Sequence, residues 1–195
     1  DSLLAGPEFQ ALWQLPPQLA DYPAQTSGDV IDALNALDQS IARWLAGDYQ
    51  IDRQQFEAQL STLRAGDGGA LMLAAAVQSR ALAQGSALFA VHSRESGLCP
   101  GGLPSESADI AQRVVSKFFA ADVQPWLAQL SRRHSQLLEP IHRIERRLQE
   151  TLPAPYRDWQ AERDDLLGEL FSAPKHHVQA IKAAFKNCDA VRWGQ

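Results

Sequence analysis

The sequence predicts an all-α protein, a single-domain bundle of about six to eight helices over residues 1–195. Three observations lead to this fold class. Apolar residues in every long segment recur at spacings of three and four, which is the helical period. No run of β-branched residues between turn signals competes with that period. With 195 residues, 45% of them hydrophobic, the chain can bury one core without metals or dense disulfides.

Residues 1–26 are expected to form an irregular segment marked by proline, which fixes φ and lacks a backbone donor. The prolines are Pro7, Pro16, Pro17 and Pro23. The first long helix is expected to begin at Thr26, because Thr26 and Asp29 have the spacing of a capping box. Its apolar stripe is expected to end near Gly47.

Two more helices are expected before the first cysteine. A short one runs from about Asp52 to Arg64 and ends at a glycine-rich turn. The next, over residues 68–91, is rich in alanine and carries a single charge, Arg80. Its length would allow a membrane crossing, but an arginine at the bilayer centre costs roughly 2.5 kcal/mol or more. We therefore expect a central buried helix and no membrane span.

Helical periodicity continues over about residues 105–152. A straight helix of that length would measure roughly 70 Å, whereas a compact protein of this size is only about 42 Å across. We expect Pro125 and Pro140 to bend or break the segment, because proline removes a donor and clashes with the preceding turn. After it, Pro174 is expected to separate a helix carrying Tyr156 from a final helix whose apolar face runs from Val178 to Cys188.

The two cysteines, Cys99 and Cys188, are predicted to form a disulfide. The bond would close a loop of about 90 residues, for which chain entropy sets a ceiling of about 4.6 kcal/mol of stabilisation. A persistent structural disulfide indicates an oxidising compartment, so we expect a periplasmic or secreted protein. The alternative is two unrelated reduced thiols, one of them a core residue.

The net charge of −5 argues against partners that need a basic face, such as nucleic acid or anionic membranes. We expect no cofactor and no nucleic-acid partner. Because the numbering starts at Asp1, a removed signal peptide or a lipid-bearing cysteine ahead of Asp1 stays open, and with it a lipid anchor upstream.

Glu139 and His142 have the Glu-x-x-His spacing of di-iron bundles and are the weak candidates for a metal site. Such a site needs a second copy of the spacing, which the sequence lacks, so no metal is expected. No motif supplies a nucleophile, a base and an oxyanion donor together, and we predict no catalytic residues. The alternative function is an enzyme or a ligand- or metal-binding bundle around His134, Glu139 and His142.

Candidate partner-binding residues come from two groups. Tryptophans near the termini need docking or a partner to become buried, and clustered arginines form either an ion-paired helix face or a contact surface for an acidic partner. The candidates are Trp13, Trp193, Arg132, Arg133, Arg143, Arg146 and Arg147. The sequence therefore favours an extracytoplasmic helical binding or adaptor protein that acts through protein–protein interaction.

Overall fold

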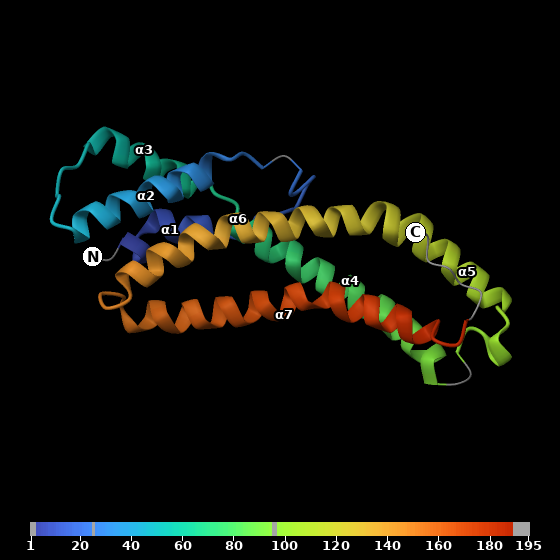
Figure 1. Cartoon of the computed structure of the whole chain (residues 1–195). Coiled ribbons are helices and arrows are strands. Elements are labelled where there is room, and N and C mark those ends of the chain that lie inside the picture. Colours follow the sequence, from blue (N-terminus) through green and yellow to red (C-terminus); the bar gives the residue numbers. More distant parts are fainter. Residues whose placement is uncertain (1–2, 25, 95–96, 189–195) are drawn as a thin grey trace. The chain divides into compact units, whose positions relative to one another are not determined.

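The computed structural model describes residues 3–24, 26–94 and 97–188, and these residues form helices and no strands (Figure 1). The predicted all-α class is confirmed. Seven α-helices lie within the described ranges, in agreement with the expected six to eight. They are α1 (Pro7–Leu12), α2 (Asp29–Leu45), α3 (Arg53–Arg64), α4 (Gly68–Arg94), α5 (Glu106–Val114), α6 (Gln124–Leu148) and α7 (Ala154–Ala184). Three further elements are η1 (Leu3–Ala5), η2 (Pro100–Gly102) and η3 (Val115–Val123), of which η3 is π-helical.

Contacts within the chain divide it into two compact units. Unit 1 comprises Asp1–Ala74 and Gln129–Leu167, and unit 2 comprises Ala75–Ala128 and Gly168–Gln195. Each boundary falls inside a helix, so α4, α6 and α7 supply residues to both units. The single domain over residues 1–195 stays a prediction.

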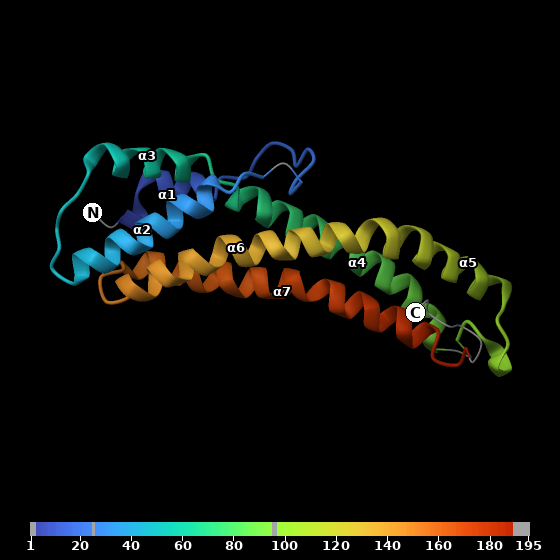
Figure 2. The same cartoon turned by 45° about the horizontal axis from the view of Figure 1, so that its top comes forward.

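The N-terminal part of unit 1 is more regular than the sequence predicted. Pro7 opens the short helix α1, a position that proline tolerates because the first helical N–H has no partner anyway. Phe9 and Leu12 of this helix are buried. Helices α1 and α2 both pack against α3 (Figures 1 and 2). The expectation of an irregular segment over residues 1–26 was therefore wrong for α1.

Helix α2 begins at Asp29, with Gly28 as its N-cap and no side-chain cap. The predicted capping box does not form, because the Thr26 hydroxyl donates its hydrogen bond to the Pro23 carbonyl instead. The predicted apolar stripe is buried from Val30 to Ile41. Helix α3 has Asp52 as its N-cap, and the Asp52 carboxylate accepts from the Gln55 N–H at 3.1 Å.

The long helical segment runs without interruption from Glu106 to Leu148, changing from α to π winding over Val115–Val123. The π-helical stretch ends just before Pro125, one of the two prolines expected to perturb this segment. Pro140 lies inside α6, so of the two expected effects, a bend or a break, the break does not occur there. Two neighbours of Pro140 on α6, Leu137 and Ile141, are fully buried. The free energy gained by burying them outweighs the loss of one backbone hydrogen bond at the proline.

Pro174 does not separate two helices, because α7 continues through it to Ala184. A proline at this position leaves the carbonyl of Leu170, four residues earlier, without its helical N–H partner. The side-chain amide of Gln78, a buried residue of α4, donates to that carbonyl at 3.4 Å. A contact distant in sequence thus replaces the missing bond and lets the helix continue.

Candidate functional site

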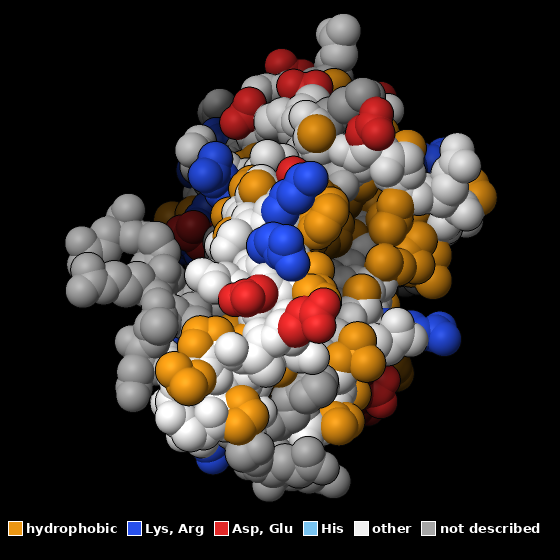
Figure 3. Space-filling view, turned by 90° about the vertical axis from the view of Figure 1, so that its right-hand side faces the viewer, with side chains coloured by type: hydrophobic (Ala, Val, Ile, Leu, Met, Phe, Trp, Pro, Cys, Tyr) orange, Lys and Arg blue, Asp and Glu red, His pale blue; other side chains and the backbone are white. Residues whose placement is uncertain are grey.

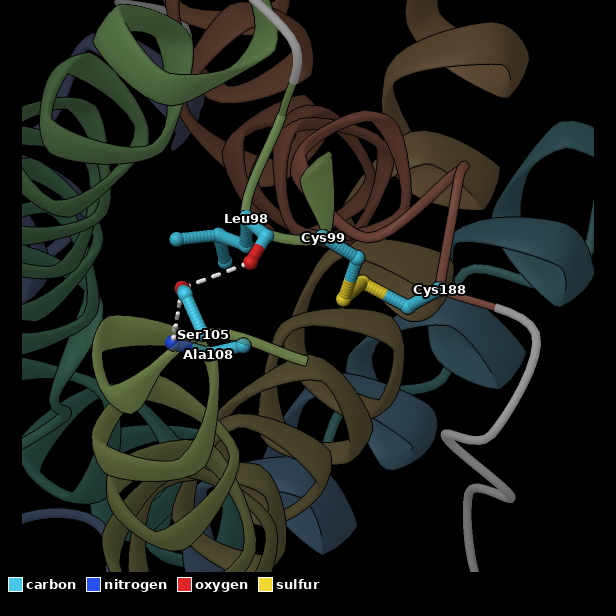
Figure 4. The surroundings of a disulfide bond; sticks show 5 residues. All are labelled: Leu98, Cys99, Ser105, Ala108 and Cys188. Atoms are coloured by element: carbon cyan, nitrogen blue, oxygen red, sulfur yellow. Dashed lines mark hydrogen bonds between the residues drawn. A yellow bond between two sulfur atoms is a disulfide. The ribbon is translucent and has the colours of Figure 1, made fainter. Parts of the chain in front are cut away.

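A disulfide joins Cys99 and Cys188 in unit 2, the pair predicted from the sequence. Cys99 is fully buried, and its neighbour Leu98 donates a backbone hydrogen bond to Ala184 at the end of α7. The Ser105 hydroxyl donates to the Leu98 carbonyl at 2.7 Å and accepts from the N–H of Ala108 at the start of α5 (Figure 4). The cysteine loop is therefore fixed to both α5 and α7.

An apolar groove of about 430 Å³ lies in unit 2, lined by residues of α4, α5, η3 and α7 and by the cysteine loop. Three large apolar side chains that line it remain exposed: Leu88 is 72% exposed, Ile110 49% and Val114 47%. Figure 3 looks onto the face that carries α5 and shows hydrophobic side chains gathered at the surface between charged groups. Unit 2 thus has an accessible apolar surface beside elements that the disulfide links covalently.

His177 of α7 lines this groove although the side chain is almost entirely buried. Its Nδ1 lies 3.0 Å from the Ser86 hydroxyl oxygen, and the Ser86 hydroxyl donates to the Leu82 carbonyl at 2.7 Å. With the one hydroxyl proton on Leu82, Nδ1 donates to Ser86. The ring also forms a hydrogen bond with the Leu82 backbone, so both residues of α4 hold the imidazole.

The surroundings of His177 favour the neutral ring. Burial lowers the pKa of His177, and a hydrogen bond with the Leu82 backbone opposes that shift only in part. The rings of Phe119 and Phe89 approach the imidazole edge-on, with centroids 4.8 and 6.0 Å away. Gly85 allows this approach, since a Cβ there would lie 2.9 Å from the Cε1 atom of His177.

The apolar face expected from Val178 to Cys188 agrees with the burial of the last helical stretch. Ile181 and Phe185 are buried, and Val178 and Cys188 are partly buried. His177 and Ala184 belong to the same buried face, at spacings of four and three from Ile181. The sequence therefore contains a signal for the burial of His177, because a histidine in phase with such a stripe faces the core.

Unit 1 contains a buried ion pair that was not expected from the sequence. Arg163 of α7 donates to both carboxylate oxygens of Glu145 in α6, at 2.7 and 3.0 Å. Glu145 also accepts from the Tyr156 hydroxyl at 2.7 Å and from the Gln160 amide at 3.0 Å. Burial, together with the Glu145 carboxylate, raises the pKa of Tyr156, so its hydroxyl keeps the proton that it donates.

The same cluster brings His142, Glu145 and Asp164 together, with ligand atoms within 4.8 Å of one another. These groups are engaged with Arg163, which donates to Asp164 as well as to Glu145, and His142 Nε2 lies 3.2 Å from Asp164. Within the described ranges, Arg163 thus already supplies a positive charge to two of the three groups, Glu145 and Asp164.

The weak metal candidates, Glu139 and His142, do not form one site. The exposed Glu139 accepts from Arg143 at 3.0 Å, whereas His142 contacts Asp164. His134 lies near His142, whose charge, after the larger effect of burial, lowers the pKa of His134.

Comparison with known proteins places the chain in a family. A family model described as "Protein of unknown function (DUF3080)" matches residues 1–191. The chain belongs to the DUF3080 family. No curated protein and no solved structure matches it.

Three of the five candidate arginines of the DUF3080 chain are engaged within unit 1. Arg133 is 5% exposed and donates to both oxygens of Asp67, at 2.8 and 2.6 Å. Arg143 and Arg147 both donate to the buried carboxylate of Asp38. These three residues therefore agree with the interpretation of the arginine cluster as an ion-paired helix face. Partner contact at Arg132 and Arg146, which are exposed, stays a prediction.

Trp13 of the DUF3080 chain packs inside unit 1, with its ring centroid 5.5 Å from that of Trp159. The Arg163 guanidinium lies over both rings, at 5.2 and 5.1 Å. An open pocket of about 510 Å³ lies beside Trp13. The chain itself therefore supplies most of the burial that Trp13 needs. The other terminal candidate, Trp193, lies outside the described residues.

Proposed function

We propose that this DUF3080 protein is an extracytoplasmic, non-catalytic binding protein that engages another protein through the apolar groove of unit 2. The observation that carries the proposal is the exposure of Leu88, Ile110 and Val114 around the groove. Soluble monomers rarely leave contiguous apolar surface in water unless it serves binding, because exposing it forfeits about 25 cal/mol for each Å².

The shape of the groove supports a helical or extended partner segment. It is lined mainly by the helical elements α4, α5, η3 and α7, and grooves between helices accept the apolar face of an amphipathic helix. The disulfide and the Leu98–Ala184 hydrogen bond fasten the elements beside it. A rigid groove loses little conformational entropy when it binds.

The Cys99–Cys188 pair supports the location outside the cytoplasm, because disulfides of this kind persist in oxidising compartments. Among the described residues, no helix has both the length and the apolar character that a membrane crossing needs. A lipid anchor upstream of Asp1 would hold the protein at a membrane surface and belongs to the same proposal. Mass spectrometry of unreduced protein from its native host tests the location, since two free thiols would contradict it.

Site-specific photo-crosslinking in the native host tests the binding face. A photoreactive amino acid at Val114 is expected to give one adduct of reproducible mass. Adding Leu88→Asp should abolish that adduct, because a carboxylate at the rim cannot be desolvated against an apolar partner. The matched control is Leu166→Asp, at an apolar position of unit 1 that is 42% exposed.

The control variant is expected to leave the adduct unchanged, and thermal unfolding of both variants should show that they remain folded. An adduct that survives Leu88→Asp, or no adduct at all, would overturn the groove as the binding face.

A further inference from the structure

The sequence continues past Cys188 with seven residues, DAVRWGQ, which lie outside the described residues. Their point of attachment is fixed, because Cys188 is bonded to Cys99 (Figure 4). Cys188 packs against a buried cluster that includes Leu98 and Val115, and both of these residues also line the apolar groove of unit 2. Residues 189–195 are therefore tethered beside the groove.

The length of this segment matches the length of the groove. Lining residues of α5 and η3 extend from Ser107 to Phe119, a stretch of about 18 Å at about 1.5 Å per helical residue. An extended chain advances about 3.3 Å per residue, so residues 189–195 can span about 23 Å. The segment can therefore cover the groove from one end to the other.

The order of side chains in the segment suits an extended chain on an apolar surface. Successive side chains of an extended chain point to opposite sides, so Val191 and Trp193 would share one side and Arg192 the other. The large apolar body of the tryptophan and the exposed walls of the groove would then remove each other from water. The same chain thus contains both the apolar surface and a side chain that can cover it.

The charges at the rim of the groove complement the segment. Glu106 and Asp109 lie in the first turn of α5, beside lining residues of the groove, and both are exposed. Neither carboxylate has an ion-pair partner among the described residues, since Arg113 donates to the Asp109 carbonyl instead. With its apolar side on the groove, the segment would turn Arg192 toward this acidic rim. Such surface pairs contribute little affinity, but they favour one orientation of a bound segment.

We propose that residues 189–195 occupy the apolar groove of unit 2 in an extended conformation, with Val191 and Trp193 packed on its exposed apolar walls, and that the partner protein displaces them. The inference rests on the proposed function, because it states how binding at that groove is regulated. A segment on a short tether meets its site at an effective concentration in the millimolar range. Only a partner that outcompetes the segment gains the groove.

Photo-crosslinking of the purified chain, with its disulfide intact and no partner present, tests the docking. A photoreactive amino acid at Val114 is expected to form an adduct within one chain, which tryptic digestion and mass spectrometry should map to residues 187–195. The matched control is Val77, a valine of unit 2 that does not line the groove and is 50% exposed, against 47% for Val114. A photoreactive group at Val77 should give no adduct with that segment.

Two results of this experiment would overturn the docking. One is the absence of an adduct at residues 187–195. The other is an adduct that joins two chains in a mixture of ¹⁴N- and ¹⁵N-labelled protein, which would make a second copy the occupant of the groove.

Substitutions in the segment test which of its sides faces the groove. Val191→Asp combined with Trp193→Asp should lower the yield of the adduct within the chain about tenfold or more, because carboxylates cannot be desolvated against apolar walls. Gly194→Asp adds a like charge on the other side of an extended chain and should leave the adduct in place. An adduct that survives the double substitution would contradict the proposed packing.

Trp193→Asp in the native host separates the inference from the proposed function. If the segment fills the groove nine-tenths of the time, the apparent affinity for the partner is about a tenth of its intrinsic value. At limiting partner we therefore expect the yield of the partner adduct at Val114 to rise about tenfold in this variant. An unchanged yield overturns the competition and leaves the groove as the binding face. Absence of a partner adduct in every variant overturns the proposed function, and the adduct within the purified chain then decides the docking on its own.

Discussion

Arg163 and Glu145 form a bidentate ion pair in which both side chains are completely removed from solvent, at 2.7 and 3.0 Å. Removing two charged groups from water is costly, and leucine and methionine could fill the same space without that cost. The pair is tolerated because Tyr156, Gln160 and Asp164 complete the hydrogen bonding around it.

Removing one partner of this pair is expected to destabilise unit 1 strongly. Glu145→Leu leaves the Arg163 guanidinium with only the partly exposed Asp164 as counter-charge, so we expect a loss of about 3 kcal/mol in the free energy of unfolding. Chemical denaturation measures this loss of stability. The double variant Glu145→Leu with Arg163→Met should recover most of the loss, because it buries no charge. A double variant less stable than the single one would contradict this account.

The disulfide is expected to stabilise unit 2 by restricting the unfolded chain. Replacing both cysteines, Cys99→Ala with Cys188→Ala, should lower the free energy of unfolding by up to about 4.6 kcal/mol, the chain-entropy ceiling for the 89-residue separation. Thermal unfolding of the double variant is compared with that of the unmutated protein with and without reductant. If reductant leaves the unmutated protein as stable as before, the bond does not contribute in this way.

Periodicity and cysteine placement were enough to predict most of the helices and the disulfide. Apolar stripes such as that of α2, from Val30 to Ile41, depend only on local spacing, so they can be read from one sequence. Cys99 and Cys188 could be paired because no other cysteine competes. Predicting these features does not require knowing which helices are neighbours in the fold.

The features that the sequence did not predict depend on partners distant in the chain. Pro174 fails to end α7 because Gln78, 92 residues from Leu170, donates to the carbonyl that the proline leaves free. Arg163 lies in phase with the apolar face of α7, four residues after Trp159 and four before Leu167, but its charge argues against burial until Glu145 is known to face it. A charged or helix-breaking residue can be interpreted correctly only when its partner is known.

The Gln78–Leu170 contact leads to a further expected result. Gln78→Leu should cost about 1–2 kcal/mol in the free energy of unfolding, because the Leu170 carbonyl then lacks a partner inside unit 2. In a Pro174→Ala background the same change should cost less, since the alanine N–H restores the helical bond to Leu170. Urea denaturation of the four proteins gives the coupling, and equal costs in both backgrounds would rule out this role for Gln78.

Two histidines are expected to make the protein less stable at mildly acidic pH. Burial lowers the pKa of His177 in unit 2 and of His134 in unit 1, where the neighbouring His142 lowers it further. Below the ordinary histidine pKa of about 6.5 the unfolded chain binds more protons at these positions than the folded chain. Stability should therefore decline as the pH falls from about 6.5, by at most about 1.4 kcal/mol per pH unit for each histidine.

His177→Asn isolates the share of one histidine in this pH dependence. The variant cannot be protonated at that position, so its free energy of unfolding should fall less steeply between about pH 6.5 and pH 5 than that of the unmutated protein. Carboxylates and His134 contribute to both proteins and cancel in the difference. Urea denaturation at a series of pH values measures the two slopes. Parallel curves would mean that His177 is protonated equally in the folded and unfolded chain.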